Sequence, residues 1–199
     1  MILFFDTETS DLPDFDKRAS DPSQPHLVQM AAILTDESAR EIECHKMLAK
    51  PDGWVMSPEA VARHGITPEF AASCGVAEYQ LILTLFCMIE RASLIVGHNI
   101  QLDKFMARIA ARRFELLPDA RDAWWKAIPQ FCTMKSMTNV CRLAGGRGCQ
   151  FKWPKLQEAY QHAFGRPFEG AHDSLADVRA TKDIYFWLHD RNRAAEDTL

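Results

Sequence analysis

The stretch that decides the fold is MILFFDTET, residues 1–9, in which five apolar side chains are followed by two carboxylates one residue apart. An apolar run of this length predicts a buried β-strand. Residues i and i+2 of a strand point to the same face, so Asp6 and Glu8 are expected to stand side by side. A divalent cation such as Mg²⁺ or Mn²⁺, which prefers oxygen ligands, would relieve the repulsion between them. The alternative is that the pair is only the solvated end of a strand.

The bulk composition is that of a globular protein. The 199 residues are 47% hydrophobic and 25% charged, so we expect a single domain over residues 1–199. The net charge of −4 argues against binding of duplex nucleic acid through a broad positively charged surface, but it permits local binding of nucleic acid. The six cysteines form no C-x-x-C pair, which predicts neither a zinc site nor a disulfide framework and favours a cytoplasmic location. We expect no signal peptide and no membrane span.

Three strands are predicted in the first quarter of the chain. After the first strand, residues 10–25 are rich in Asp and Pro, which predicts a loop at the rim of the two carboxylates. Residues 26–35 and 42–48 have the pattern of strands, and a short polar turn joins them. Three strands with short connections imply an antiparallel meander.

Helices and strands alternate in the rest of the chain. Cap-and-proline pairs at Ser57-Pro58 and Thr67-Pro68 predict two helix starts, and Asn99 is a candidate cap for a third helix. The remaining patterns predict helices at 76–89, 100–113, 134–143 and from 173 or 174 to about 191, and strands at 94–96 and 131–133. The expected fold is α/β: a mixed five-stranded sheet, made of three antiparallel strands and then β-α units, flanked by helices.

Two more acids and a histidine lie at element ends that can converge on Asp6 and Glu8. Asp103 begins a helix after a buried strand, and His172 and Asp177 lie at the start of the final helix. In open α/β sheets, sites collect at strand ends and the adjoining helix starts. Each residue has another explanation: the helix dipole favours Asp103, Asp177 could complete a capping box, and His172 could be an ordinary loop histidine.

Taken together, these segments resemble a known family. The segments FDTET at 5–9, GHN at 97–99 with Asp103, and HDSLAD at 172–177 resemble the motifs of the DEDDh 3′-to-5′ exonucleases. This is the DnaQ-like branch of the RNase H-like superfamily, which includes polymerase proofreading subunits. The segment HGIT at 64–67 also looks like a family segment, whereas Asp11 stands where the family usually has glycine.

The resemblance implies a metal-dependent exonuclease that hydrolyses DNA from the 3′ end and releases nucleoside 5′-monophosphates. Asp6, Glu8, Asp103 and Asp177 would hold two Mg²⁺ or Mn²⁺ ions, and these four acids with His172 form the implied catalytic set. His172 would act as the general base that takes a proton from the attacking water.

Binding of the substrate is expected to involve residues around the same motifs. Those expected to contact the terminal nucleotides are Thr7, Thr9, Leu12, His64, Ile66 and Asn99. Lys104, Arg108 and Arg112 recur every four residues and form a basic stripe that could follow phosphates or could simply be a solvated helix face. Trp153, between Lys152 and Lys155, marks a second candidate patch or a core position. The expected partners are nucleic acid, preferably DNA with a free 3′ end, and a polymerase or another replication or repair protein.

Two alternatives to a DNA exonuclease stay open. One is an exoribonuclease or oligoribonuclease of the same family, because discrimination between sugars depends on contacts with the 2′ hydroxyl. The other is a non-catalytic module that binds nucleic acid or a polymerase. Such a module has no need of all four acids and the histidine.

Overall fold

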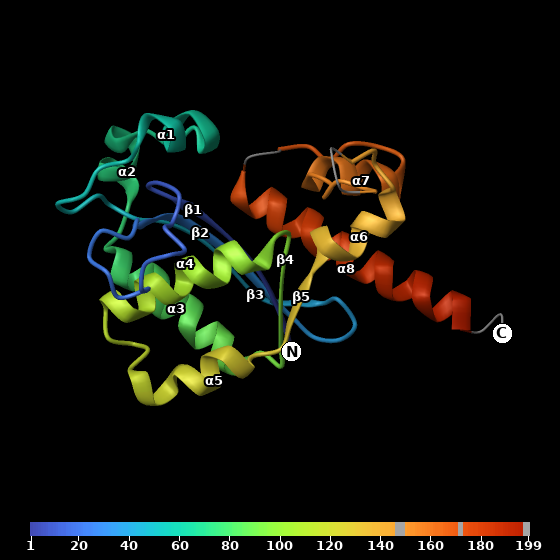
Figure 1. The fold of residues 1–199 in the computed structure, drawn as a ribbon, viewed down its shortest axis with the longest axis horizontal. Coiled ribbons are helices and arrows are strands. Elements are labelled where there is room, and N and C mark those ends of the chain that lie inside the picture. The colour runs from blue at the N-terminus through green and yellow to red at the C-terminus, as the bar shows by residue number, and fades with distance from the viewer. Residues whose placement is uncertain (146–149, 171–172, 197–199) are drawn as a thin grey trace.

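The centre of the molecule is a mixed five-stranded sheet in the order β3-β2-β1-β4-β5 (Figure 1). The computed structural model describes residues 1–145, 150–170 and 173–196. β2 pairs antiparallel with both β1 and β3, whereas β4 is parallel to β1 and β5 is parallel to β4. The predicted meander and mixed sheet are therefore confirmed. The strands are β1 Ile2–Thr9, β2 Leu27–Thr35, β3 Glu41–Leu48, β4 Leu94–Gly97 and β5 Gln130–Cys132.

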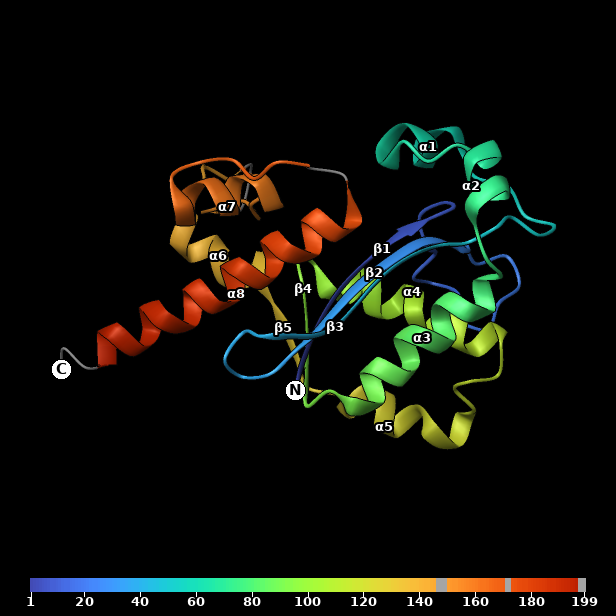
Figure 2. The same cartoon turned by 180° about the vertical axis from the view of Figure 1, so that it is seen from behind.

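Helices cover both faces of the sheet (Figures 1 and 2). One face carries α3 Glu78–Arg91, α4 Ile100–Arg113, the short helix η1 Asp119–Arg121 and α5 Asp122–Ala127. The other face carries α6 Thr133–Cys141, α7 Leu156–Phe164 and the long α8 Ser174–Glu196. The two short helices α1 Pro58–His64 and α2 Pro68–Cys74 lie near the end of β1. None of the helices in the described ranges is both long and apolar enough to cross a membrane.

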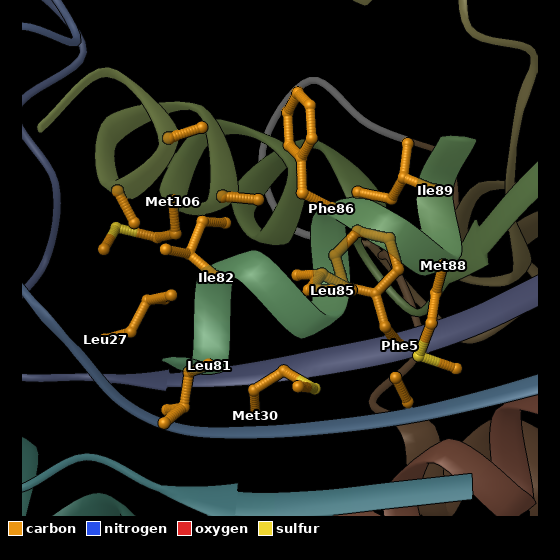
Figure 3. Close-up of a cluster of buried hydrophobic side chains, with 14 of the residues drawn as sticks. Phe5, Leu27, Met30, Leu81, Ile82, Leu85, Phe86, Met88, Ile89 and Met106 are labelled. Carbon is orange, nitrogen blue, oxygen red and sulfur yellow. The ribbon is translucent and has the colours of Figure 1, made fainter. Parts of the chain in front are cut away.

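The apolar run of β1 is explained by burial on both faces. Leu3 and Phe5 pack in the larger core cluster with α3 and α4, whereas Phe4 packs on the opposite face against α8. Figure 3 shows Phe5 and Met30 of the sheet among the apolar side chains of α3. A strand buried on both faces needs apolar residues at successive positions rather than at alternate ones. This places β1 at the centre of the sheet.

Two helices were not predicted, and one predicted cap is wrong. α5 and α7 lie in segments for which the sequence pattern indicated no helix. Asn99 does occupy the position before α4, but it has left-handed backbone angles and its side chain makes no capping hydrogen bond. It turns the chain from β4 into α4, a conformation that asparagine tolerates better than most residues.

A buried carboxylate anchors the start of β2. Glu78 accepts hydrogen bonds from the Leu27 backbone N–H and from Arg113, both at 2.9 Å, and its second oxygen lies 2.6 Å from Nδ1 of His26. Arg113 also donates to the backbone carbonyls of residues 24 and 25. The end of the 10–25 loop is thereby tied to α3 and α4.

We expect Glu78→Ala to lower the free energy of unfolding by about 2–4 kcal/mol, because it leaves the buried Leu27 N–H and the partly buried Arg113 guanidinium without their acceptor. Urea unfolding followed by circular dichroism measures the change. Glu37→Ala, at an exposed position in the β2–β3 turn, is the control and should stay within about 0.5 kcal/mol of the wild type. An unchanged unfolding midpoint for Glu78→Ala would show that the network contributes no stability.

Candidate active site

The candidate site forms where β1 extends past the end of β4. The two strands pair only from Ile2 to Phe4 on the β1 side, so the later residues of β1 have no strand partner there. Asp103, in the first turn of α4, lies beside these residues in place of a strand. The backbone N–H and the hydroxyl of Thr7 both donate to Asp103 Oδ1, at 2.9 Å and 2.8 Å. These bonds satisfy a buried backbone donor and hold Asp103 beside the two acids of β1.

The structure brings the four predicted carboxylates into one electrostatic cluster. Burial raises the pKa of Asp6 well above its usual value, and the charges of Asp103, Glu8 and Asp177 add to this effect. Burial, followed by the charges of Asp103 and Asp177, raises the pKa of Glu8 to about 7, against the opposing charge of Arg63. Burial also raises the pKa of Asp103 to about 6, although its hydrogen bonds from Thr7 act in the other direction.

The raised pKa values predict how the stability of the metal-free protein depends on pH. The folded state holds the Glu8 proton more tightly than the unfolded chain, so stability falls as pH rises from about 4.5 to about 7 and levels off above that range. At pH 8 in chelator, Glu8→Gln should therefore raise the melting temperature by roughly 5 °C, the shift expected from about 1–2 kcal/mol in a chain of this size. Thermal scans at several pH values should show this gain shrinking toward pH 4.5.

Glu37→Gln, which removes an exposed carboxylate, is the matched control and should leave the melting temperature unchanged at every pH. A Glu8→Gln protein less stable than the wild type at pH 8 would contradict the explanation, because it would mean that the Glu8 charge is compensated in the folded state.

The start of α8, which carries Asp177, is fixed to the sheet. The Asp173 carboxylate accepts hydrogen bonds from two backbone N–H groups of the first turn, so Asp173 is the helix cap. Ser174 is buried and donates to Gln29 of β2 at 2.5 Å, and Lys46 of β3 lies 2.6 Å from Asp173. Because Asp173 is the cap, Asp177 does not form a capping box with Ser174.

The remaining predicted site residues differ in how exposed they are and in the hydrogen bonds they make. His172 lies outside the described residues. Leu12 is 57% exposed, and the Thr9 hydroxyl donates to the Asp11 carbonyl. Ile66 is buried in a small core cluster and so presents little surface to a base, contrary to expectation. Thr7 was also expected to contact the terminal nucleotide, but its backbone N–H donates to Asp103 instead.

His64 and Asn99 flank the cluster at the ends of neighbouring elements. His64 is the last residue of α1, and its Nδ1 accepts from the Ile66 backbone N–H at 3.0 Å. Its Nε2 is buried, and an interaction of the ring with the Thr9 backbone partly offsets the effect of burial on the pKa. Burial lowers the pKa of His64, so the ring is neutral at neutral pH. Asn99 is partly exposed.

Two residues near the site were missed or misjudged from the sequence. Arg63, exposed in the last turn of α1, acts on Glu8 through its charge, yet nothing in its local pattern distinguished it from a surface arginine. His98 lies in a matched motif, but it bridges Thr133 Oγ1 and the Pro154 carbonyl, each at 3.0 Å, and burial lowers its pKa to about 4. It therefore braces the end of β4. Elsewhere in the chain, Trp153 is 64% exposed, so it does not occupy the core position that the sequence allowed.

The chemistry of the carboxylate cluster suits a hard divalent cation. Its four donors are all carboxylates, and the raised pKa values of Asp6, Glu8 and Asp103 show charge that the protein itself does not neutralise. Among the residues that the structure describes, however, no three or more His, Cys, Asp or Glu side chains are arranged to hold a metal ion as they stand. The site is thus a cluster whose oxygens would have to converge further to surround an ion.

Comparison with known proteins identifies the family. The family model RNase T, described as exonuclease, matches residues 3–185. The chain belongs to this exonuclease family. The resemblance to the DnaQ-like branch and the predicted RNase H-like fold are thereby confirmed. No curated protein matches this exonuclease chain significantly in sequence.

Solved structures of exonuclease I share the fold of this exonuclease chain. The zinc-bound Escherichia coli exonuclease I–ssDNA complex matches 99% of the chain with a TM-score of 0.72 and 25% identity. Exonuclease I from Methylocaldum szegediense matches 96% of the chain with a TM-score of 0.67 and 28% identity. The chain covers 42% and 40% of those two proteins, so it spans about two fifths of their length.

Proposed function

We propose that residues 1–199 act as one metal-dependent 3′-to-5′ exonuclease domain that hydrolyses DNA from its 3′ end and releases nucleoside 5′-monophosphates. The observation that carries this proposal is the cluster of four mutually repelling carboxylates at the end of β1, beside the start of α4 and the start of α8. Membership of the exonuclease family and similarity to exonuclease I structures with bound single-stranded DNA support it.

Asp6, Glu8, Asp103 and Asp177 would hold two Mg²⁺ or Mn²⁺ ions, and His172 would take the proton of the attacking water. When bound, the ions supply an activated hydroxide, neutralisation of the phosphate charge and stabilisation of the leaving 3′ oxygen. Thr7 keeps Asp103 in a fixed orientation through its two hydrogen bonds, as groups behind a ligand commonly do. A zinc-bound form is known for E. coli exonuclease I, but an all-carboxylate set favours Mg²⁺ or Mn²⁺.

Contacts with the end of the substrate would come from the rim of the cluster. Leu12 is exposed on the loop after β1, where an apolar side chain can lie against a base regardless of sequence. Thr9, His64 and Asn99 complete the proposed contact set. We also propose that the partner is a polymerase or another replication or repair protein, and that the location is cytoplasmic.

The proposal is tested by incubating the chain with end-labelled single-stranded DNA, duplex DNA and RNA, each with Mg²⁺, with Mn²⁺ and with chelator. Release of mononucleotides from the 3′ end of DNA that stops in chelator is the expected result. Faster release from RNA would identify an exoribonuclease. Binding without cleavage under every metal condition would identify a non-catalytic module.

A further inference from the structure

A second feature of the molecule lies on α4, away from the carboxylate cluster. Successive helix residues are 100° apart, so Phe105 points to the side of α4 opposite Asp103. On that side, α4, α5 and the first residue of β5 enclose a cavity of about 240 Å³. Figure 1 shows α5 beside α4 at this side of the sheet. The polar groups that line the cavity come from Gln101, Lys104, Arg108, Lys126 and Gln130.

Lys104 is the unusual residue of this cavity. Its side chain is buried, with only 8% of the residue exposed. Its ammonium group makes one hydrogen bond within the described part of the chain, a long one of 3.4 Å to the Ile128 carbonyl, and lies 6.0 Å from the centroid of the Trp125 ring. An ammonium group has three donors, so most of its hydrogen-bonding capacity is unused. A buried cation with little compensation from the protein lowers the stability of the fold, and the cavity beside Lys104 leaves room for an anionic group to pair with it.

Arg108 adds a second cation to the lining of the same cavity. Its guanidinium group pairs with Asp122, but its Nε is buried and has no hydrogen-bond partner among the described residues. Asp122 also accepts from Arg112 and Lys126, and Asp119 pairs with Arg112 as well, so two carboxylates face these three cations and Lys104. The local charge is therefore positive even after these ion pairs are counted.

The basic surface continues past Phe105. A second cavity of about 460 Å³ shares Phe105 and Arg108 with the first. It is also lined by three further cations and one carboxylate, namely Lys17, Arg18, Arg112 and Asp119. Phe15 from the 10–25 loop stacks on Phe105, with ring centroids 4.9 Å apart, and is itself 65% exposed. Cations interleaved with an exposed aromatic ring are the features by which proteins hold single strands without reading their sequence.

We propose that these two cavities form a groove along α4 that binds the phosphate backbone of a single-stranded nucleic acid, on the part of the strand away from its 3′ end. This inference rests on the proposed function, because it takes the exonuclease substrate as the occupant. Lys104 donates to a phosphate oxygen, and Phe15 offers a face on which a base stacks. The excess of cations over carboxylates in the groove selects an anionic partner.

The test is binding of a fluorescent oligothymidylate of about 12 nucleotides in chelator, where no hydrolysis occurs. Lys104→Met should weaken binding about 10-fold, as expected for loss of one charged hydrogen bond. It should reduce the slope of log affinity against log salt by about 0.7, the loss of one phosphate contact on a single strand. It should also raise the melting temperature, because a buried charge is removed. Lys135→Met, on the exposed side of α6, is the matched control and should change none of these quantities.

A second variant tests the groove without touching a buried residue. Gln101 is exposed at the mouth of the cavity, so Gln101→Glu adds a negative charge there and should weaken binding, whereas Gln80→Glu in the first turn of α3 should not. If Lys104→Met and Gln101→Glu both bind the oligonucleotide as tightly as the wild type, this inference is overturned but the proposed function is not. Failure of the wild type to bind the oligonucleotide overturns both. Binding of a polyglutamate peptide in preference to the oligonucleotide, lost in Lys104→Met, would show that the groove serves a protein and also overturns the inference.

Discussion

Replacement of Asp6 by asparagine is expected to lower the hydrolysis rate by about 10³-fold or more, because a lost ligand removes several kcal/mol of charge stabilisation at the reacting phosphate. The same change should raise the melting temperature of the metal-free protein. Asp6 is repelled by Asp103, Glu8 and Asp177, so the neutral amide relieves a cost that the folded chain carries without an ion. Initial rates on a labelled oligonucleotide with Mg²⁺, together with thermal scans in chelator, measure the two effects.

Asp177→Asn should lower the hydrolysis rate in the same way, since it removes an acid from the same cluster by way of α8 rather than β1. Asp52→Asn, in an exposed turn, is the control and should keep wild-type turnover and stability. Near-normal turnover by either cluster variant would refute the proposed site. A fall in melting temperature in chelator would show that the carboxylate is needed for folding, contrary to the repulsion described here.

The parts of the fold that could be predicted are those that depend on local pattern. Strand alternation placed Asp6 and Glu8 on one face, and short polar connections implied the meander. α5 was missed because it has six residues and too few turns for a helical period to appear. α7 was missed because its cap position holds Lys155, whose type signals no helix start.

The parts of the site that could not be predicted depend on contacts between distant segments. The hydrogen bonds from Thr7 to Asp103 join residues 96 positions apart, and they exist only because β4 ends before β1 does. Likewise, the sequence spacing indicated that Arg108 and Arg112 belong to a free basic stripe. In the structure, α5 and η1 place Asp122 and Asp119 against them. Sequence spacing places a charge on a helix face, but the element packed against that face decides whether the charge is available.

Replacement of His172 by alanine is expected to lower the hydrolysis rate by about 10²-fold to 10⁴-fold, the usual contribution of a general base. His172 lies outside the described residues, and the prediction rests on its place directly before the anchored cap of α8. An imidazole of ordinary pKa, about 6.5, is neutral and able to accept a proton at pH 7.5. The wild-type rate should therefore rise through about pH 6.5, and the variant should lose that rise.

Binding of the oligonucleotide and stabilisation by Mg²⁺ should persist in His172→Ala, because the four carboxylates remain. His162→Ala, at an exposed position of α7, is the control and should retain both the rate and the pH profile. A His172→Ala protein that keeps the rise through pH 6.5 would assign the proton transfer to another group. Glu8, whose pKa is raised to about 7, would then be the first residue to test, since it titrates in the same range.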